Sequence, residues 1–255
     1  MSLSENQKYI VLKSIQDNLE KSEKAWEMHG DYLTQKSITL ECIAADQSQP
    51  SKIPGYSNVN EVPKADQFIA LVVDMRKSSS RLKTKCKESL LEDGLQRLYY
   101  ETSALLPAIA ETVAFENGAV TEYLGDGALA LFRVDKNSAF DTIRAASRAA
   151  RNCIVDTRNL INSEIDRRYN LPPLQLGVGL SIGNALVTLV GSTENRQPKV
   201  FGECVWEATK LSSGVNEIYV SKKLRERWPS SPGGRISFGE IKKLRGIDGS
   251  CLRFK

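Results

Sequence analysis

The segment TEYLGDGALALF, residues 121–132, is the part of the chain that most restricts how it can fold. Two short apolar runs, residues 119–124 and 128–133, flank Gly125-Asp126-Gly127, and such a turn between such runs is typical of a β-hairpin. A second buried-strand pattern, QFIALVVD, ends in Asp74. The pattern therefore predicts a sheet in which two strands each carry an aspartate at one end.

The rest of the chain alternates between strand and helix patterns. From residue 68 the order reads β-α-β-β-α-β, with helices expected over Glu88–Phe115, where Pro107 would introduce a kink, and from Ser138 to about Arg168. A second hairpin is expected from strands near 174–182 and 185–190, turning about Ile182-Gly183-Asn184. Further elements follow to the end of the chain: a helix over Glu203–Leu211, the strand EIYV, the helix KKLRERW and two terminal strands.

This order predicts an α+β fold, with a ferredoxin-like βαββαβ core and additional C-terminal strands and helices. An amphipathic helix is expected from Ser4 to near Gly30, with a capping box formed by Ser4 and Gln7. Residues 46–64 contain three prolines and read as a linker. We therefore divide the chain into residues 1–64, an N-terminal helical extension with its linker, and residues 65–255, the main domain.

Composition removes several kinds of chemistry. His29 is the only histidine, and the five cysteines include no CxxC pair, which argues against a zinc site, a disulfide framework and a histidine-activated nucleophile. A catalytic metal would have to be held by carboxylates and backbone oxygens, which favours Mg²⁺ or Mn²⁺. The longest apolar run, FIALVV, is too short to span a bilayer, and the N-terminus lacks a secretory pattern, so we expect a cytoplasmic protein with no membrane partner.

The expected topology gives the two aspartates a shared position. In a βαββαβ sheet the third strand lies antiparallel beside the first, so the end of one meets the start of the other. Asp74 and Asp126 are therefore expected side by side, close enough to share metal ions. The polar loop that follows Asp74 includes Arg76, Lys77, Ser78 and Ser79. It offers backbone N–H groups and hydroxyls for phosphate oxygens. Either aspartate alone would read as a turn or strand-end residue.

These residues resemble the class III nucleotidyl cyclase catalytic domain over about residues 68–254. The matching pieces are FIALVVDM, EYLGDGALALF, GVGLSIGNALVTLVGS and VFGECVWEATKLSSGVNEIYVS. The resemblance implies attack of the ribose 3′-hydroxyl of a nucleoside triphosphate on its α-phosphorus, with pyrophosphate as leaving group. It also implies two Mg²⁺ or Mn²⁺ ions per active site, held by Asp74, Asp126 and the carbonyl of Met75.

The resemblance further implies a head-to-tail homodimer with active sites shared between the chains. Asp74 and Asp126 would serve one site, and a second set of residues would serve the other: Glu122, Lys199, Trp206 and Lys210. In this scheme Lys210 stabilises charge on the reacting phosphate, while Trp206 packs in the core or stacks on the base or ribose. Either Lys243 or Arg245 would meet the triphosphate.

The base-reading positions depart from both purine patterns of this family. Glu122 matches guanylyl rather than adenylyl cyclases, whereas Lys199 matches neither. Glu122 can accept from an N–H and Lys199 can donate to a carbonyl, which suits the imide edge of uracil or guanine. The alternative is that the two side chains simply form an ion pair with each other.

Together with the short N-terminal extension, these departures resemble the pyrimidine cyclases of bacterial anti-phage defence, the Pycsar group. That resemblance implies cyclic UMP or cyclic CMP as a second messenger, and the imide argument favours UTP. Two alternatives stay open: a purine cyclase making cyclic GMP or cyclic AMP, and a degenerate domain that binds nucleotide as a regulator. Residues 221–255 carry ten basic and three acidic residues, but without interleaved aromatics we expect no nucleic-acid partner.

Overall fold

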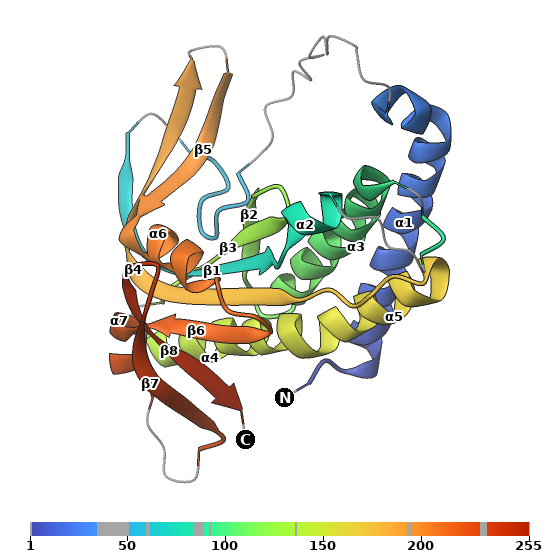
Figure 1. The fold of residues 1–255 in the computed structure, drawn as a ribbon. Helices are drawn as coiled ribbons and strands as arrows, with labels where there is room; N and C mark the ends of the chain where they lie inside the picture. Colours follow the sequence, from blue (N-terminus) through green and yellow to red (C-terminus); the bar gives the residue numbers. More distant parts are fainter. Residues whose placement is uncertain are drawn as a thin grey trace.

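The computed structural model describes residues 2–34, 51–59, 62–83, 89–91, 93–135, 137–192, 195–229 and 234–254. These described residues form sixteen elements, in the chain order shown in Figure 1. The helices are α1 (Glu5–Thr34), α2 (Ser78–Lys83), α3 (Gly94–Ala114), α4 (Ala139–Asn152), a π-helical turn (Cys153–Thr157), α5 (Arg158–Tyr169), α6 (Glu203–Leu211) and α7 (Lys222–Glu226). The strands are β1 (Lys64–Met75), β2 (Ala119–Tyr123), β3 (Gly127–Arg133), β4 (Leu176–Ser192), β5 (Asn195–Gly202), β6 (Glu217–Ser221), β7 (Ile236–Leu244) and β8 (Ile247–Phe254).

The eight strands form one sheet in the order β2-β3-β1-β4-β6-β8-β7, with β5 paired to β4. β3 and β4 both run antiparallel to β1, which is the arrangement expected of a βαββαβ core. β6 joins β4 in parallel, and the hairpin of β7 and β8 completes the sheet. The predicted α+β fold with extra C-terminal elements is therefore confirmed.

Both faces of the sheet are covered, and alternate residues of β1 serve the two cores. Ile69, Leu71 and Val73 belong to the larger core, which they share with the helical layer. Phe68, Ala70 and Val72 face the other way, toward a smaller core that contains residues of α6 and β5. Because Asp74 continues this second set along the strand, it lies on the α6 face of the sheet.

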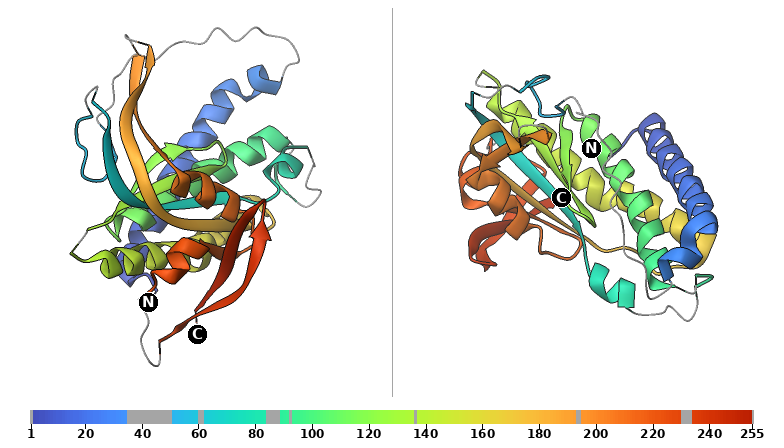
Figure 2. Two further views of the ribbon diagram at one scale, coloured as in Figure 1. Left: turned by 90° about the vertical axis from the view of Figure 1, so that its left-hand side faces the viewer. Right: turned by 90° about the horizontal axis from the view of Figure 1, so that it is seen from above.

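Helix α1 forms an outer layer against α3 and α5 (Figure 2). The capping box is present: the Ser4 N–H donates to Gln7 Oε1 at 2.9 Å, and the Gln7 N–H donates to Ser4 Oγ at 3.3 Å. Val11, Ile15 and Leu19 are fully buried in the larger core. The helix runs to Thr34, four residues beyond its expected end. Thus α1 shares the main core, although the boundary at residues 64/65 stays a prediction.

The expected hairpin about Ile182-Gly183-Asn184 is wrong, because these residues lie inside one continuous strand. β4 runs from Leu176 to Ser192, and its second half pairs with both β1 and β5. The glycine serves packing rather than a turn: a Cβ on Gly183 would lie 3.2 Å from the Cβ of Cys204 on α6. The absent side chain lets α6 lie close to the strand. The hairpin that does form joins β4 to β5, and we call this pair the arm.

The start of α3 also differs from expectation. α3 begins at Gly94, where Asp93 accepts hydrogen bonds from the next two free backbone N–H groups at 2.6 and 3.2 Å. Its expected start at Glu88 lies outside the described residues, as do residues 46–50 and 60–61 of the expected linker. Pro107 lies within α3, as expected. The helix expected from Ser138 to about Arg168 is confirmed: α4, the π-helical turn and α5 follow one another without a gap from Ala139 to Tyr169.

Candidate functional site

The structure places Asp74 and Asp126 at the same edge of the sheet. Asp74 pairs in register with Gly127, the residue directly after Asp126. The Met75 N–H then donates to the carbonyl oxygen of Asp126 at 3.2 Å. The expected juxtaposition of β1's end and β3's start is confirmed, and it brings together two acids that are far apart in the sequence.

The two glycines around Asp126 have different tasks. Gly125 has φ +79° with open space at its Cβ position, so it supplies the left-handed conformation of the turn. Gly127 allows the end of β1 to approach the start of β3 closely: a Cβ there would lie 2.5 Å from the Val73 carbonyl oxygen and 3.4 Å from Asp74 Oδ1. The Val73 carbonyl therefore requires glycine at this position, and the carboxylate of Asp74 lies close beside it.

The oxygen donors at this edge fit Mg²⁺ or Mn²⁺. Because the N–H of Met75 faces β3, its carbonyl faces the same side of the strand. Two carboxylates and one carbonyl are hard ligands of the kind these ions prefer, and they leave coordination positions for phosphate or water. Among the described residues no cluster of three or more His, Cys, Asp or Glu side chains forms another metal centre.

Arg76 contacts Asp74, one of the candidate metal ligands. Its guanidinium forms an ion pair with Asp74 and donates to the Ser213 carbonyl at 3.4 Å, while its buried Nε has no hydrogen-bond partner among the described residues. Burial, reinforced by the nearby charge of Arg245 and opposed by Asp126, lowers the pKa of Arg76. A divalent ion at Asp74 would therefore compete with this guanidinium or share the carboxylate with it.

The loop after β1 presents the polar residues expected to meet phosphate. Lys77 is exposed and takes a left-handed conformation, with φ 62°, which turns the chain into α2. Ser78 opens that helix, and Ser79 follows it on the surface. The N–H groups of a first helical turn have no partner within their helix, so they are available to a ligand. The Arg76 N–H is not among them, since it donates to the Gln175 carbonyl at 2.7 Å.

A buried ion-pair cluster fixes the position of α2, and sequence reasoning missed it. Glu101 on α3 is fully buried, and its Oε1 lies 2.5 Å from Arg81 Nη1 and 3.0 Å from Arg97 Nε. Arg81 also donates to the Pro173 carbonyl at 2.7 Å. The i,i+4 spacing of Arg97 and Glu101 was visible in the sequence. The pairing to Arg81 was not, because it joins two elements across the fold.

Helix α6 exposes the two residues expected to act on the reacting phosphate and the base. Trp206 is 54% exposed, so the expectation that it packs in the core is wrong. Its ring lies against Lys210, whose Nζ is 5.8 Å from the ring centroid, in cation–π range. One helical turn separates the two residues, and both side chains project together from the helix.

Glu122 and Lys199 meet within one chain. An irregularity in the β2–β3 register between Val120 and Glu122 re-aims the glutamate. Its Oε2 lies 2.7 Å from Lys199 Nζ on β5, and both side chains are partly exposed. This is the ion pair named above as the alternative to base recognition. It holds both groups at one place without yet engaging a base.

The structure separates the two basic candidates near the C-terminus. Arg245 occupies the β7–β8 turn with φ 48°, and its charge helps to lower the pKa of Arg76. Lys243 instead lines a cavity of about 490 Å³ of mixed charge, together with Glu203, Glu207 and Asp248. Of the two candidates, Arg245 is the one whose charge acts on the residue paired with Asp74.

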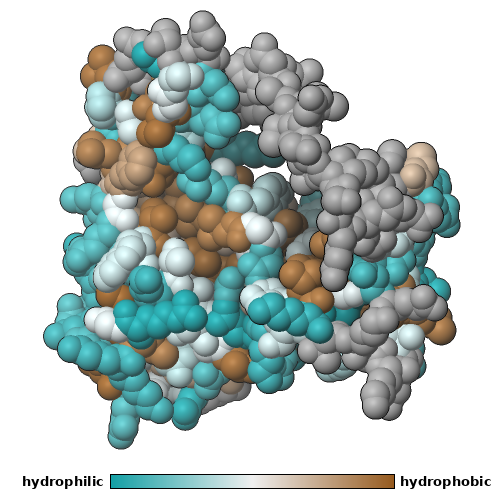
Figure 3. All heavy atoms as spheres, turned by 45° about the horizontal axis from the view of Figure 1, so that its top comes forward, coloured by the Kyte–Doolittle hydropathy of each residue, from teal (hydrophilic) through white to brown (hydrophobic). Residues whose placement is uncertain are grey.

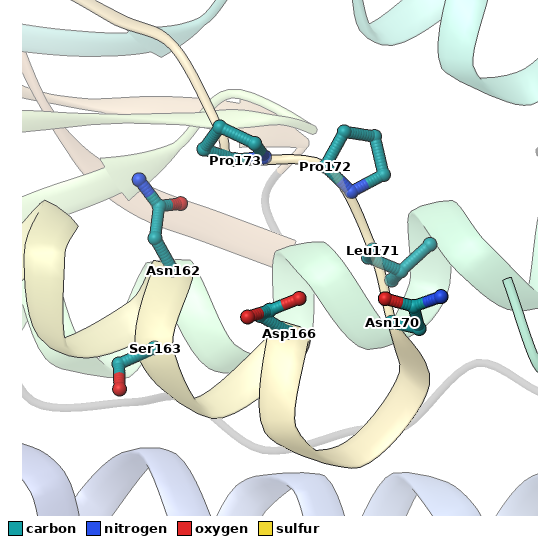
Figure 4. A pocket seen from close by; sticks show the side chains of 7 residues that line it. All are labelled: Asn162, Ser163, Asp166, Asn170, Leu171, Pro172 and Pro173. Carbon is teal, nitrogen blue, oxygen red and sulfur yellow. The ribbon is translucent and has the colours of Figure 1, made fainter. Parts of the chain in front are cut away.

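A further cavity, of about 470 Å³, lies beside α5 and the segment after it (Figure 4). Asn162 lines it, but the side-chain amide of this residue is bonded to the Leu174 backbone, accepting at 2.7 Å and donating at 3.4 Å. Asn170, in a left-handed conformation, ends the helix by donating its N–H to the Asp166 carbonyl. These groups shape the chain reversal, and we assign them a structural role.

Comparisons with known proteins agree with this geometry at the level of the fold. No protein-family model and no curated protein sequence matches the chain. The crystal structure of the guanylyl cyclase Cya2 is similar, with a TM-score of 0.60 and 18% identity over 74% of this chain and 92% of that one. The crystal structure of the adenylyl cyclase CyaB from P. aeruginosa is also similar, with a TM-score of 0.61 and 15% identity over 76% of this chain and 97% of that one.

A third similar structure is the guanylate cyclase domain of RhGC from Catenaria anguillulae in complex with GTP. Its TM-score is 0.54 at 13% identity, and the match covers 75% of this chain and 99% of that one. Among the described residues, no helix is both long enough and apolar enough to cross a membrane. At these identities the similarity establishes architecture: the chain has the mixed α+β fold of adenylyl and guanylyl cyclase catalytic domains.

Proposed function

We propose that the protein is a nucleotidyl cyclase that converts a pyrimidine nucleoside triphosphate, with UTP favoured, to the 3′,5′-cyclic monophosphate and pyrophosphate. The observation that carries the proposal is the shared position of Asp74 and Asp126 on a cyclase-type sheet. In the reaction the ribose 3′-oxygen forms a bond to the α-phosphorus, the bond from that phosphorus to pyrophosphate breaks, and the 3′-hydroxyl proton passes to water.

Asp74, Asp126 and the Met75 carbonyl would hold two Mg²⁺ or Mn²⁺ ions in each active site. Such ions neutralise the triphosphate and lower the pKa of the 3′-hydroxyl. The chain's own groups orient the substrate around them. The N–H groups and hydroxyls of Ser78 and Ser79 receive phosphate oxygens, with Lys77 beside them. Arg76 and Arg245 add positive charge next to the aspartates, once Arg76 has moved from Asp74 to phosphate.

The second set of residues would act from the partner chain of a homodimer. Lys210 stabilises negative charge on the reacting phosphate, and exposed Trp206 offers a face for the base or ribose. Dimerisation is supported by exposed apolar residues on the arm, namely Leu186, Val190 and Phe201. Figure 3, with the top of Figure 1 brought forward, shows hydrophobic side chains gathered near the centre of this face.

The Glu122–Lys199 pair supports a uracil-type preference. The Glu122 carboxylate and the Lys199 ammonium lie 2.7 Å apart. In place of their bond to each other, Glu122 can accept from the N3–H of an imide edge and Lys199 can donate to an adjacent carbonyl. Guanine presents the same edge, so a guanylyl cyclase is the purine alternative. By the resemblance to Pycsar enzymes, the product would act as a second messenger in anti-phage defence.

One experiment separates these possibilities. The purified protein is incubated with Mn²⁺ and each of the four ribonucleoside triphosphates, and the products are identified by mass. Cyclic UMP as main product supports the proposal, and cyclic GMP or cyclic AMP moves it to a purine cyclase. Asp126→Ala should abolish turnover, whereas Asp141→Asn, a change to an exposed acid on α4, should not.

Mixing two inactive variants tests whether the sites are shared between chains. Asp126→Ala and Lys210→Ala are expected to be inactive alone. A mixture should recover up to about one quarter of wild-type activity, because about half of randomly assembled dimers are mixed and each of these has one intact site of its two. If the mixture stays inactive although heterodimers form, each site belongs to one chain.

The second candidate is a nucleotide-binding regulator without catalysis. The ion pair of Arg76 with Asp74 favours it, because the guanidinium covers a carboxylate that the reaction requires. In that case no triphosphate yields a cyclic product, although calorimetry still detects nucleotide binding.

A further inference from the structure

A basic and aromatic cavity lies between α4, α7 and the start of β7, away from the aspartate edge. Its volume is about 410 Å³, within the range of small-molecule sites. Three arginines line it, one from α4, one from α7 and one from the residue before β7, together with apolar side chains that include an indole and a phenyl ring: Arg144, Arg225, Arg235, Trp228, Ile236 and Phe238. No acidic side chain is among the described residues that line it.

The floor of the cavity is preorganised. Arg225 Nη1 donates to Ser250 Oγ at 2.7 Å and to the Gly239 carbonyl at 3.3 Å, which holds the guanidinium in place. The same guanidinium lies 5.5 Å from the centre of the Phe238 ring. Trp228 meets Phe238 edge to face, with ring centroids 5.2 Å apart. Cation and aromatic faces are therefore fixed relative to each other before any ligand arrives.

Two exposed arginines carry positive charge that ion pairs within the described residues leave largely available. In that part of the chain Arg144 pairs with Asp141 alone, at 3.1 Å, and both side chains are more than half exposed. Such surface pairs contribute little and are easily exchanged for a better anion. Arg235 is exposed at the start of the segment that leads into β7. Glu226 lines the adjoining cavity, which shares Trp228.

The cavity is separate from the proposed catalytic site. The adjoining cavity, which shares Trp228, contains Gln67, and Gln67 lies seven residues before Asp74 on β1, roughly 20 Å along the strand. Its aromatic members pack against the core on the helical face of the sheet, whereas Asp74 faces α6. A ligand in this cavity would not touch Asp74 or Asp126.

We propose that this cavity binds a free nucleoside phosphate. The phosphate is bound by Arg144 and Arg235 at the rim and by the fixed Arg225, and the base lies against Trp228 and Phe238. Guanidinium groups are the preferred protein partners of phosphate, and aromatic faces accept any base, so the class of ligand is a mononucleotide rather than a particular base. The assignment gives a role to part of the basic excess in residues 221–255 and does not depend on the proposed cyclase activity.

The test uses the full chain in EDTA, so that no divalent ion supports binding at the aspartate edge. Trp206→Phe leaves Trp26 and Trp228 as the only tryptophans. AMP, adenosine and inorganic phosphate are titrated separately, with binding followed by tryptophan fluorescence and calorimetry. AMP is expected to bind saturably, at least tenfold more tightly than adenosine or phosphate, because only AMP engages both halves of the site.

Variants then assign the binding to these residues. Arg235→Ala, at an exposed position, and Arg144→Ala should each weaken AMP binding at least tenfold, and Trp228→Phe should keep binding but remove the fluorescence change. Lys222→Ala, an exposed lysine of the same α7 that lines a different cavity, is the matched control and should bind as the parent does. The proposal is overturned by unchanged AMP binding in both arginine variants, by no binding at millimolar AMP, or by an oligonucleotide binding more than tenfold tighter than AMP.

Discussion

Replacing Gly127 with alanine tests how the two aspartates are held together. The added Cβ would lie 2.5 Å from the Val73 carbonyl oxygen, whereas real Cβ contacts are essentially never below 3.0 Å. Since the obstacle is backbone, the start of β3 must move away from β1 by at least half an ångström. Asp126 moves with it, and the Met75 N–H to Asp126 hydrogen bond, already 3.2 Å, is stretched.

We expect Gly127→Ala to lower the free energy of unfolding by about 1–3 kcal/mol, the usual cost of overpacking. Mn²⁺ affinity should fall more than tenfold, because displacement of a ligand by even ~1 Å can cost about a hundredfold in activity at a preorganised site. Urea denaturation and calorimetric titration with Mn²⁺ measure the two effects.

Gly125→Ala is the matched control. Its Cβ would meet nothing within 4 Å, but φ +79° is strained for alanine, so it should cost about 1 kcal/mol of stability with a smaller loss of Mn²⁺ affinity. The reasoning is refuted if Gly127→Ala binds Mn²⁺ as the wild type does, or if Gly125→Ala loses as much affinity as Gly127→Ala.

Three further changes probe the surroundings of the site. Glu101→Gln should lower the free energy of unfolding by about 3–5 kcal/mol, because it leaves buried Arg97 and the partly buried Arg81 without their countercharge, and a wild-type denaturation midpoint would contradict this. Arg167 and Arg168 lower the pKa of Glu164 to about 2, so Glu164→Gln should cost about 2 kcal/mol at pH 7. Since the folded pKa lies below the unfolded one, that difference should fade as the pH falls from about 5 to 2, and a difference constant with pH would refute the assignment. Arg76→Ala should raise Mn²⁺ affinity in the absence of nucleotide by removing the competing cation from Asp74, and unchanged affinity in calorimetry would count against competition.

The aspartate edge could be predicted from the sequence because it depends on few steps. Short continuous apolar runs identify β1 and β3, a glycine-flanked turn identifies the hairpin, and the βαββαβ order then determines which strand ends meet. Each step uses local pattern or a general rule of topology. The position of Asp74 opposite Gly127 follows from them.

Other features depend on contacts between distant elements, which a single sequence does not show. Gly183 looked like a turn residue, but its lack of a side chain accommodates Cys204 of α6. Trp206 looked like core because it is large and apolar, whereas α6 buries its other side through Ala208 and Leu211. The Arg76 ion pair with Asp74 is a choice of side-chain conformation, and nothing in residue spacing specifies it.

Crystals of the protein grown with Mn²⁺ and a non-hydrolysable UTP analogue give the most direct test of the central claim. Anomalous diffraction should locate two Mn²⁺ ions at the carboxylates of Asp74 and Asp126 and the Met75 carbonyl, with Arg76 moved from Asp74. Manganese bound elsewhere, or Arg76 still paired with Asp74 and no ion at that edge, would contradict the account.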